Sequence, residues 1–254
     1  MANRIYLTAP IRIQGPAGVI GEAHLHGPQG RLVLAMLVLE HRRPVGRDEI
    51  AGELWPDEMP SSWDLSVKVL ISKIRGVLRQ VAPDMRLEGA VGYYQLVVPS
   101  DTSIDVELAA ARIHTGEAAY RSGEVEAAAA DGLVASMIAL RPFLPGFDGS
   151  WATACRARLV DVRLRALDLL SQVWLVRGEP DQAARDAQAI LGIDPYREAA
   201  YRTLIRAHLA RGDHASAARV LAQCAERLSV DLGVEPAAET QALLGSDSTP
   251  RIPT

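Results

Sequence analysis

Basic side chains gather in one short segment of the sequence. Residues 66–80 read SVKVLISKIRGVLRQ and contain both lysines of the chain, two arginines and no acidic residue. The four cations are Lys68, Lys73, Arg75 and Arg79. Cationic side chains hold phosphate oxygens, and short side chains between them can approach base edges. The segment therefore has the composition of a helix that contacts DNA.

Helical periodicity divides this segment into two faces. At roughly 100° per residue, its larger apolar side chains fall on one stripe, which we expect to pack on a core. That stripe consists of Val67, Ile71, Ile74 and Leu78. The opposite face is centred on Leu65, Val69, Ser72 and Gly76. We expect residues 62–80, Ser66 included, to lie in a DNA major groove, with Leu65 and Val69 near thymine methyl groups. An ordinary solvated helix face gives the same charge pattern, so the neighbouring elements must decide.

Enzymatic chemistry finds little support in the residues. His24 and His26 would share one face of a strand, but no Cys or Asp cluster accompanies them as further metal ligands. Cys155 and Cys224 fall in helical patterns and are most simply core residues. No nucleophile elbow or phosphate-binding loop stands between a strand and a helix. We expect no catalysis, no metal and no cofactor.

The elements around the basic segment follow a definite order. Short strands are expected within residues 5–13 and 19–25, joined by a turn at Gly15-Pro16. Helices are expected over residues 29–40, 47–54 and 61–80, the last with Ser61 or Ser62 as N-cap. A hairpin pattern over residues 86–98 follows. In this hairpin Arg86 and Tyr93 are candidate DNA contacts, and Arg47 at the start of the middle helix could meet phosphate.

Residues from 105 onward are rich in alanine and arginine and have helical periodicity. LVRGEPDQAA (175–184) and LARGDHASAA (209–218) are 34 residues apart, which is the period of tetratricopeptide (TPR) repeats, and YRSGEVEAAA (120–129) is a looser copy. The glycine in each copy permits a sharp turn between antiparallel helices. The spacing between YRSGEVEAAA and LVRGEPDQAA is longer than 34 residues, which predicts an insertion at residues 141–149.

Composition sets the broad class. The chain has 254 residues, 48% of them hydrophobic and 23% charged, and its formal net charge is −4. Residues 1–99 carry a net charge of +1 and residues 100–254 a net charge of −5. No apolar run reaches the roughly 20 residues that a membrane span needs. Two cysteines are too few for a disulfide framework, which suits a cytoplasmic location.

The first module resembles a known family. Residues 1–98 are similar to the winged-helix DNA-binding domain of the OmpR/PhoB type, in the form found in antibiotic regulatory proteins (the SARP family). The similarity is carried by GPQGRLVLAMLVL (27–39), PVGRDEIAGELWPDEMP (44–60), VLISKIRGVL (69–78) and GYYQL (92–96). The resemblance implies DNA contacts at Lys68, Ser72, Lys73 and Arg75. The chain departs from the family pattern at Leu65, where arginine or another polar residue is common, and at Lys73 and Gly76, where arginine is common.

The second module resembles the bacterial transcriptional activator domain that follows the winged helix in this family. The matching residues are Ile104-Asp105, PYREAAYRTLIRAHLARGDHASA (195–217) and LGVEP (232–236). The resemblance implies transcription activation, with RNA polymerase or a sigma factor as partner. It also implies direct-repeat sites near promoters of a secondary-metabolite gene cluster, which would place two copies of the chain on DNA.

Together these features predict an α+β winged helix-turn-helix domain followed by an all-α domain of TPR-like helix pairs. We expect the first domain over residues 1–99, the second over residues 100–245 and a flexible tail over residues 246–254. The expected function is sequence-specific binding of double-stranded DNA by a transcriptional activator. The alternative is a non-enzymatic regulatory adaptor whose helical repeats bind a protein or a small ligand.

Overall fold

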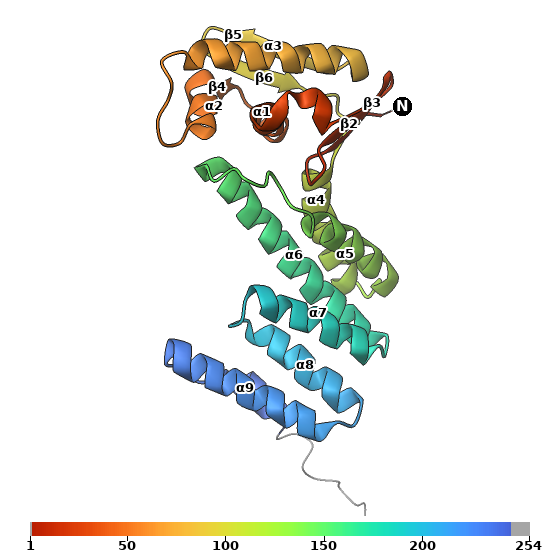
Figure 1. The fold of residues 1–254 in the computed structure, drawn as a ribbon. Helices are drawn as coiled ribbons and strands as arrows, with labels where there is room; N and C mark the ends of the chain where they lie inside the picture. Colours follow the sequence, from red (N-terminus) through yellow and green to blue (C-terminus); the bar gives the residue numbers. More distant parts are fainter. Residues whose placement is uncertain (1, 245–254) are drawn as a thin grey trace, which may run out of the picture. The chain divides into compact units, whose positions relative to one another are not determined.

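The computed structural model describes residues 2–244 (Figure 1). These residues form two compact units. Among the described residues, the first unit comprises 2–110 and 137–160, and the second comprises 111–136 and 161–244. The division falls within three helices, so the units are interleaved along the sequence. The domain boundary expected near residue 100 stays a prediction. It divides the chain into consecutive domains, whereas the first compact unit contains residues from both sides of position 100. The expected tail, residues 246–254, lies outside the described residues.

A four-stranded sheet opens the first unit. Its strand order is β3-β2-β1-β7, with β1 (Arg4–Tyr6), β2 (Arg12–Gly15) and β3 (Gly18–Gly21) antiparallel. The strand β7 (Ser103–Ile104) pairs with β1 in parallel. Sequence patterning did not predict β7, because two residues are too few to show a periodicity.

Both early strand predictions were too long. Between β1 and β2 the amides of Leu7 and Thr8 donate to the buried Asp105 carboxylate, at 2.9 and 3.0 Å, so they do not pair with a strand. After β3 the chain turns into the 3₁₀ helix η1 (Glu22–Leu25). There the Glu22 carboxylate accepts from the Ile11 amide and from Arg31, which holds the turn against β2 and the following helix.

Three helices complete the core of the first unit. They are α1 (Gly27–Leu39), α2 (Arg47–Leu54) and α3 (Trp63–Val81). The bounds of α2 are those predicted, and α1 and α3 begin and end within two residues of their predictions. Every residue from Leu32 to Val38 is at most 1% exposed, so α1 is the central helix on which α2 and α3 pack.

A second, three-stranded sheet of order β4-β6-β5 carries the predicted hairpin. It consists of β4 (Val45–Gly46), β5 (Arg86–Ala90) and β6 (Tyr93–Val97). The hairpin turn is Val91-Gly92, where Gly92 has a φ of +94° that side chains rarely adopt. The two strands of this hairpin, with the turn between them, cover residues 86–97 of the predicted 86–98. Helix, helix, basic helix and hairpin thus follow the order expected of a winged helix.

Helix pairs build the rest of the chain. The helices are α4 (Asp105–Arg121), α5 (Val125–Ala139), α6 (Ser150–Val176), α7 (Pro180–Ile193), α8 (Glu198–Ala210), α9 (His214–Leu232) and α10 (Ala238–Ala242). The repeat glycines Gly123, Gly178 and Gly212 have φ values of 81°, 72° and 73° and connect α4 to α5, α6 to α7 and α8 to α9. The predicted repeat is therefore a set of antiparallel helix pairs. The predicted insertion, residues 141–149, is the connection between α5 and α6.

The start of α6 belongs to the first unit. The Glu53 carboxylate of α2 accepts from the Trp151 amide and the Ser150 hydroxyl, both at 2.9 Å, and so caps α6. The indole N–H of Trp151 donates to Glu40 at 2.8 Å. Contacts about 100 residues apart in sequence therefore join α6 to α1 and α2. Within residues 2–244, no helix combines the length and apolar character that crossing a membrane requires.

Candidate nucleic-acid interface

Helix α3 has one buried and one exposed face. The predicted core stripe, Val67, Ile71, Ile74 and Leu78, is at most 2% exposed. On the other face Leu65 is 65% exposed and Val69 is 44% exposed. Leu65 and Val69 are one helical turn apart, so they lie together on the exposed face of α3.

Most of the predicted contact residues lie at the surface of the first unit. The exposed ones are Leu65, Lys68, Val69, Ser72, Lys73, Arg79, Arg86 and Tyr93. Arg47, Ser66 and Arg75 are partly buried. The Ser66 hydroxyl donates to the Ser62 carbonyl one turn earlier, at 3.2 Å.

An acidic residue that the sequence interpretation did not consider lies among these cations. Asp64, in the first turn of α3, accepts from Arg47 of α2 and from Lys68, both at 2.6 Å. The Lys68 ammonium, which hydrogen-bonds this carboxylate, lowers the pKa of Asp64, and the charge of Arg47 acts in the same direction. Asp64 therefore stays ionised and neutralises part of the charge that Arg47 and Lys68 could offer to phosphate.

The hairpin is joined to both helices of the interface. Arg75 of α3 donates to the Leu87 carbonyl of β5 through Nε and Nη2, at 3.1 and 3.0 Å. The Arg47 amide at the start of α2 donates to the Gly92 carbonyl in the hairpin turn, at 3.0 Å. Hydrogen bonds within the chain thus set the position of the wing relative to α3. Arg75 acts as a positioning residue for the wing as well as a candidate contact.

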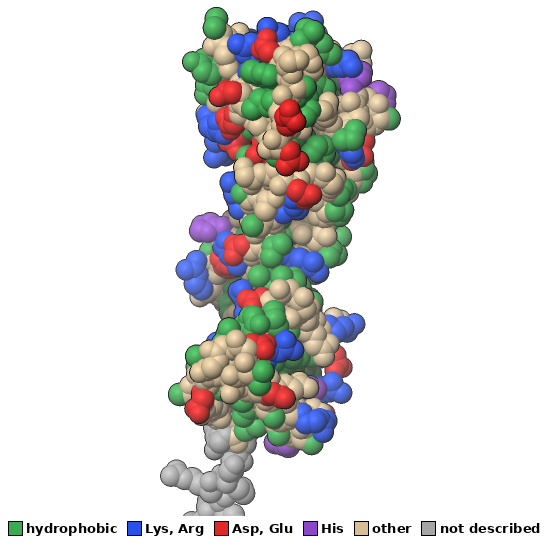
Figure 2. Space-filling model, turned by 60° about the vertical axis from the view of Figure 1, so that its left-hand side comes forward, with side chains coloured by type: hydrophobic (Ala, Val, Ile, Leu, Met, Phe, Trp, Pro, Cys, Tyr) green, Lys and Arg blue, Asp and Glu red, His purple; other side chains and the backbone are tan. Residues whose placement is uncertain are grey.

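Lys73 differs from the other lysine in its surroundings. Among the described residues it forms no ion pair and no side-chain hydrogen bond, whereas Lys68 is paired with Asp64. Its ammonium is therefore available to an external anion without the loss of an internal partner. Figure 2 shows basic and acidic side chains interspersed over the visible surface, so local pairing decides which cations are available.

The other residues that could do chemistry are not arranged for it. His24 lies in η1 and His26 follows with a φ of 57°. The two side chains therefore do not share one face of a strand, which a metal site at this pair would need. Within the part of the chain that the structure describes, no three His, Cys, Asp or Glu side chains are grouped to hold a metal ion. Cys155 and Cys224 are buried, as expected of core residues, and burial raises the pKa of each thiol to about 11.

Comparison with known proteins identifies the helical part. Residues 104–245 match the family model described as the bacterial transcriptional activator domain. The match covers more than half of the chain. It begins at β7 and ends just beyond the last described residue.

Individual relatives extend over the first unit as well. The chain is 28% identical over 220 residues to the transcriptional regulatory protein EmbR of Mycobacterium tuberculosis, which covers 85% of this chain and 56% of that protein. It is 28% identical over 211 residues to the regulatory protein AfsR of Streptomyces coelicolor, covering 82% of this chain and 21% of that one. The chain thus spans about half the length of EmbR and about a fifth of that of AfsR.

A solved structure is similar over nearly the whole chain. The structure of Mycobacterium tuberculosis EmbR in complex with a low-affinity phosphopeptide superposes with a TM-score of 0.79 at 25% identity. The similarity covers 96% of this chain and 64% of that one. The fold class predicted from the sequence, a winged helix followed by helix pairs, is confirmed.

Proposed function

The chain belongs to the bacterial transcriptional activator domain family, and from this premise we propose that it is a transcription activator that binds specific sequences in double-stranded DNA. The first unit binds the DNA. The names of the relatives, transcriptional regulatory protein and regulatory protein, support a role in gene regulation. The confirmed resemblance to the antibiotic regulatory protein family supports the same role.

The exposed face of α3 is the observation that carries the proposal. A 19-residue helix with its apolar stripe buried presents Leu65, Val69 and Ser72 outward between cationic side chains. The major groove of B-DNA admits one α-helix, and thymine offers a methyl group there for apolar contact. In the proposed complex Leu65 and Val69 contact such methyl groups, and Ser72 bonds to a base edge.

The cations around this face supply the affinity. Lys68, Lys73 and Arg79 of α3 reach phosphates on either side of the groove, and Arg47 contacts the backbone at the start of α2. Arg86 and Tyr93 extend the contact from the wing. These contacts orient α3 but carry no sequence information themselves.

The helical part is proposed to contact the transcription machinery, either RNA polymerase or a sigma factor. By its family resemblance the chain binds direct repeats near promoters of a secondary-metabolite gene cluster. A direct repeat requires two copies arranged head to tail on the DNA.

Recovery of bound fragments from the source genome, read for a repeated motif, tests this proposal. The recovered fragment is then titrated with the unchanged protein, with Lys73→Ala, and with Arg4→Ala as a control on the four-stranded sheet. Each phosphate contact contributes about −0.9 to the slope of log K against log[salt]. Lys73→Ala is expected to weaken binding and to make the slope shallower by about one contact, and Arg4→Ala is expected to leave both unchanged. If no fragment is retained at low salt, DNA binding is refuted and the adaptor function is favoured.

A further inference from the structure

A groove runs along one side of the second unit. Two hollows, of about 570 and 270 Å³, share the lining residues Tyr120, Asp168 and Gln172 and are therefore continuous. The first hollow reaches from α4 to Arg197, just before α8. The second continues along α6 and α8 to Glu239 of α10.

Helical geometry explains why these side chains share one groove. On α6 the lining residues begin at Arg165 and recur every three or four positions as far as Val176, which places them on one face. On α8 the lining residues Ala199, Arg202 and Arg206 have the same spacing. The first helix of each pair thus turns one face toward the groove.

The charge of the groove is opposite to that of its surroundings. Five arginines line it, against three carboxylates. The arginines are Arg121, Arg165, Arg197, Arg202 and Arg206, and the carboxylates are Glu117, Asp168 and Glu239. Residues 100–254 together carry a net charge of −5. An excess of cations in a concave surface attracts an anionic ligand.

The arginines of the groove differ in how closely carboxylates pair with them. Arg165 forms a two-fold hydrogen bond with Glu117, at 2.9 and 2.7 Å, and Arg197 pairs closely with Asp168. By contrast, Arg202 and Arg206 share the single carboxylate of Glu239, at 3.4 and 3.6 Å. The exposed Arg121 donates to the Glu117 carbonyl at 3.3 Å and forms no ion pair within the described residues. Positive charge in excess of the nearby carboxylates therefore lies on α4, beside the first hollow, and on α8, beside the second.

We propose that this groove binds an extended acidic peptide segment of a partner protein, whose carboxylates pair with Arg121 on α4 and with Arg206 on α8. The stretch of α6 from Arg165 to Val176 rises by about 16 Å, which an extended chain covers with about five residues. Tyr120, Leu175 and Val176 offer contacts for the side chains between the acids. This inference concerns the second unit alone and does not depend on DNA binding.

A peptide fits the groove better than a nucleic acid does. Duplex DNA carries one negative charge per roughly 1.7 Å of its axis, with no neutral units between charges. The carboxylates of Glu117, Asp168 and Glu239 would repel such a dense row of phosphates. An acidic peptide can place neutral residues opposite these carboxylates.

A peptide-binding titration on the full chain tests the inference. The probe is a fluorescein-labelled octapeptide that alternates glutamate and alanine, and its partner probe has glutamine in place of every glutamate. We expect saturable binding of the acidic probe and at least tenfold weaker binding of the neutral one. Arg206→Glu is expected to weaken binding of the acidic probe at least tenfold, and Arg121→Gln is expected to weaken it severalfold.

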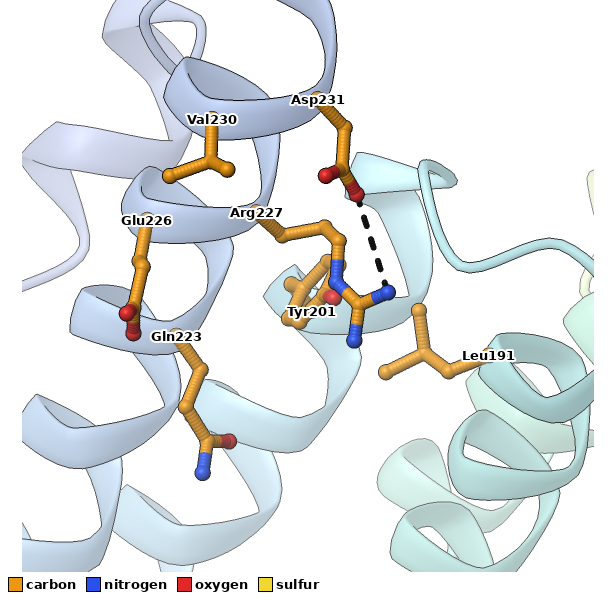
Figure 3. A pocket seen from close by; sticks show the side chains of 7 residues that line it. All are labelled: Leu191, Tyr201, Gln223, Glu226, Arg227, Val230 and Asp231. Carbon is orange, nitrogen blue, oxygen red and sulfur yellow. Dashed lines mark ion pairs between the residues drawn. The ribbon is translucent and has the colours of Figure 1, made fainter.

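Arg227 provides the matched control. It lines a different hollow, of about 510 Å³, between α7, α8 and α9, together with Glu226 and Asp231 (Figure 3). Its side chain is 51% exposed and 3.7 Å from Asp231, much as Arg206 is 46% exposed and 3.6 Å from Glu239. Arg227→Glu makes the same charge change outside the groove and is expected to alter binding of the acidic probe less than twofold.

Three results would overturn the inference. One is the absence of saturable binding by the acidic probe to a protein whose circular dichroism is that of a folded helical chain. Another is an equal loss of binding in Arg206→Glu and Arg227→Glu, which would indicate a general charge effect. The third is tighter binding of a single-stranded oligonucleotide that is lost in Arg206→Glu, which would make the groove a nucleic-acid site. Retention of duplex DNA by Arg206→Glu would separate any of these results from a failure of the proposed function.

Discussion

Replacement of Asp64 by asparagine should strengthen binding to DNA and make it more sensitive to salt. In the free protein the Asp64 carboxylate lies 2.6 Å from both Arg47 and Lys68, so these three side chains together carry one net positive charge. Asparagine keeps the size and shape of the side chain and removes its charge. The two cations then carry two net charges toward the phosphates.

The size of the effect follows from the release of counterions. One additional neutralised phosphate steepens the slope of log K against log[salt] by about 0.9, which is a factor of roughly three to four in affinity between 50 and 200 mM salt. Asp64→Asn is therefore expected to bind severalfold more tightly than the unchanged protein at 50 mM salt. This advantage should shrink as the salt concentration rises.

Fluorescence anisotropy with a labelled duplex, repeated at four or five salt concentrations, measures both quantities. Asp101→Asn is the control, because it removes the same charge from an exposed turn after the wing. An unchanged slope in Asp64→Asn would mean that Arg47 and Lys68 do not face the DNA. Weaker binding at every salt concentration would mean that the carboxylate orients the two cations for contact, which would refute the reasoning from charge.

Three further predictions concern the architecture that supports the interface. Asp105→Ala removes the acceptor of three hydrogen bonds from Leu7 and Thr8. It should lower the free energy of unfolding, measured by urea denaturation, by about 3–5 kcal/mol. The control Asp101→Ala should change this free energy by less than about 0.5 kcal/mol. Gly76→Ala should raise helix stability by up to about 1 kcal/mol, since a Cβ there meets no atom within 4 Å, and it should weaken DNA binding only if the helix backbone approaches the duplex at this point. Cys155 and Cys224, with thiol pKa values raised to about 11 by burial, should resist alkylation at pH 7.5 in the folded protein and react fully in denaturant; rapid labelling of either one without denaturant would contradict its buried position.

Local signals in the sequence were sufficient for the elements of the interface. The apolar stripe of α3 repeats every three or four residues, and Pro56 and Pro83 mark where helices cannot continue. The repeat glycines were placed correctly for a similar reason. Glycine adopts the left-handed conformation of a tight helix–helix turn at the lowest cost, so Gly178 and Gly212 mark their turns.

Long-range contacts could not be predicted in this way. Strand β7 has two residues and exists because it pairs with β1 about 100 positions earlier. Asp105 was noted only as part of a family motif, yet its carboxylate ties together the backbone between β1 and β2. Glu53 shows no local sign that it caps α6. Periodicity reports which face of an element is apolar, but not which distant donor a carboxylate accepts from.

Part of the interface was missed for a simpler reason. The predicted helix, residues 61–80, contains Asp64, but a charge balance over residues 66–80 alone leaves this carboxylate out. Including the first turn of α3 lowers the net charge of the helix by one. The Leu87 carbonyl accepts two hydrogen bonds from Arg75. It is a backbone group, and the pattern of side chains does not predict which arginine it accepts from.

Selection of binding sites from a random pool of duplexes, carried out in parallel with the unchanged protein and Val69→Ser, tests most directly whether α3 reads the major groove. We predict that the unchanged protein selects a defined motif and that Val69→Ser relaxes the preference at one T·A pair while the rest of the motif is retained. An identical motif at every position for both proteins would contradict the placement of Val69 against the bases. Failure of the unchanged protein to select any motif would contradict sequence-specific recognition itself.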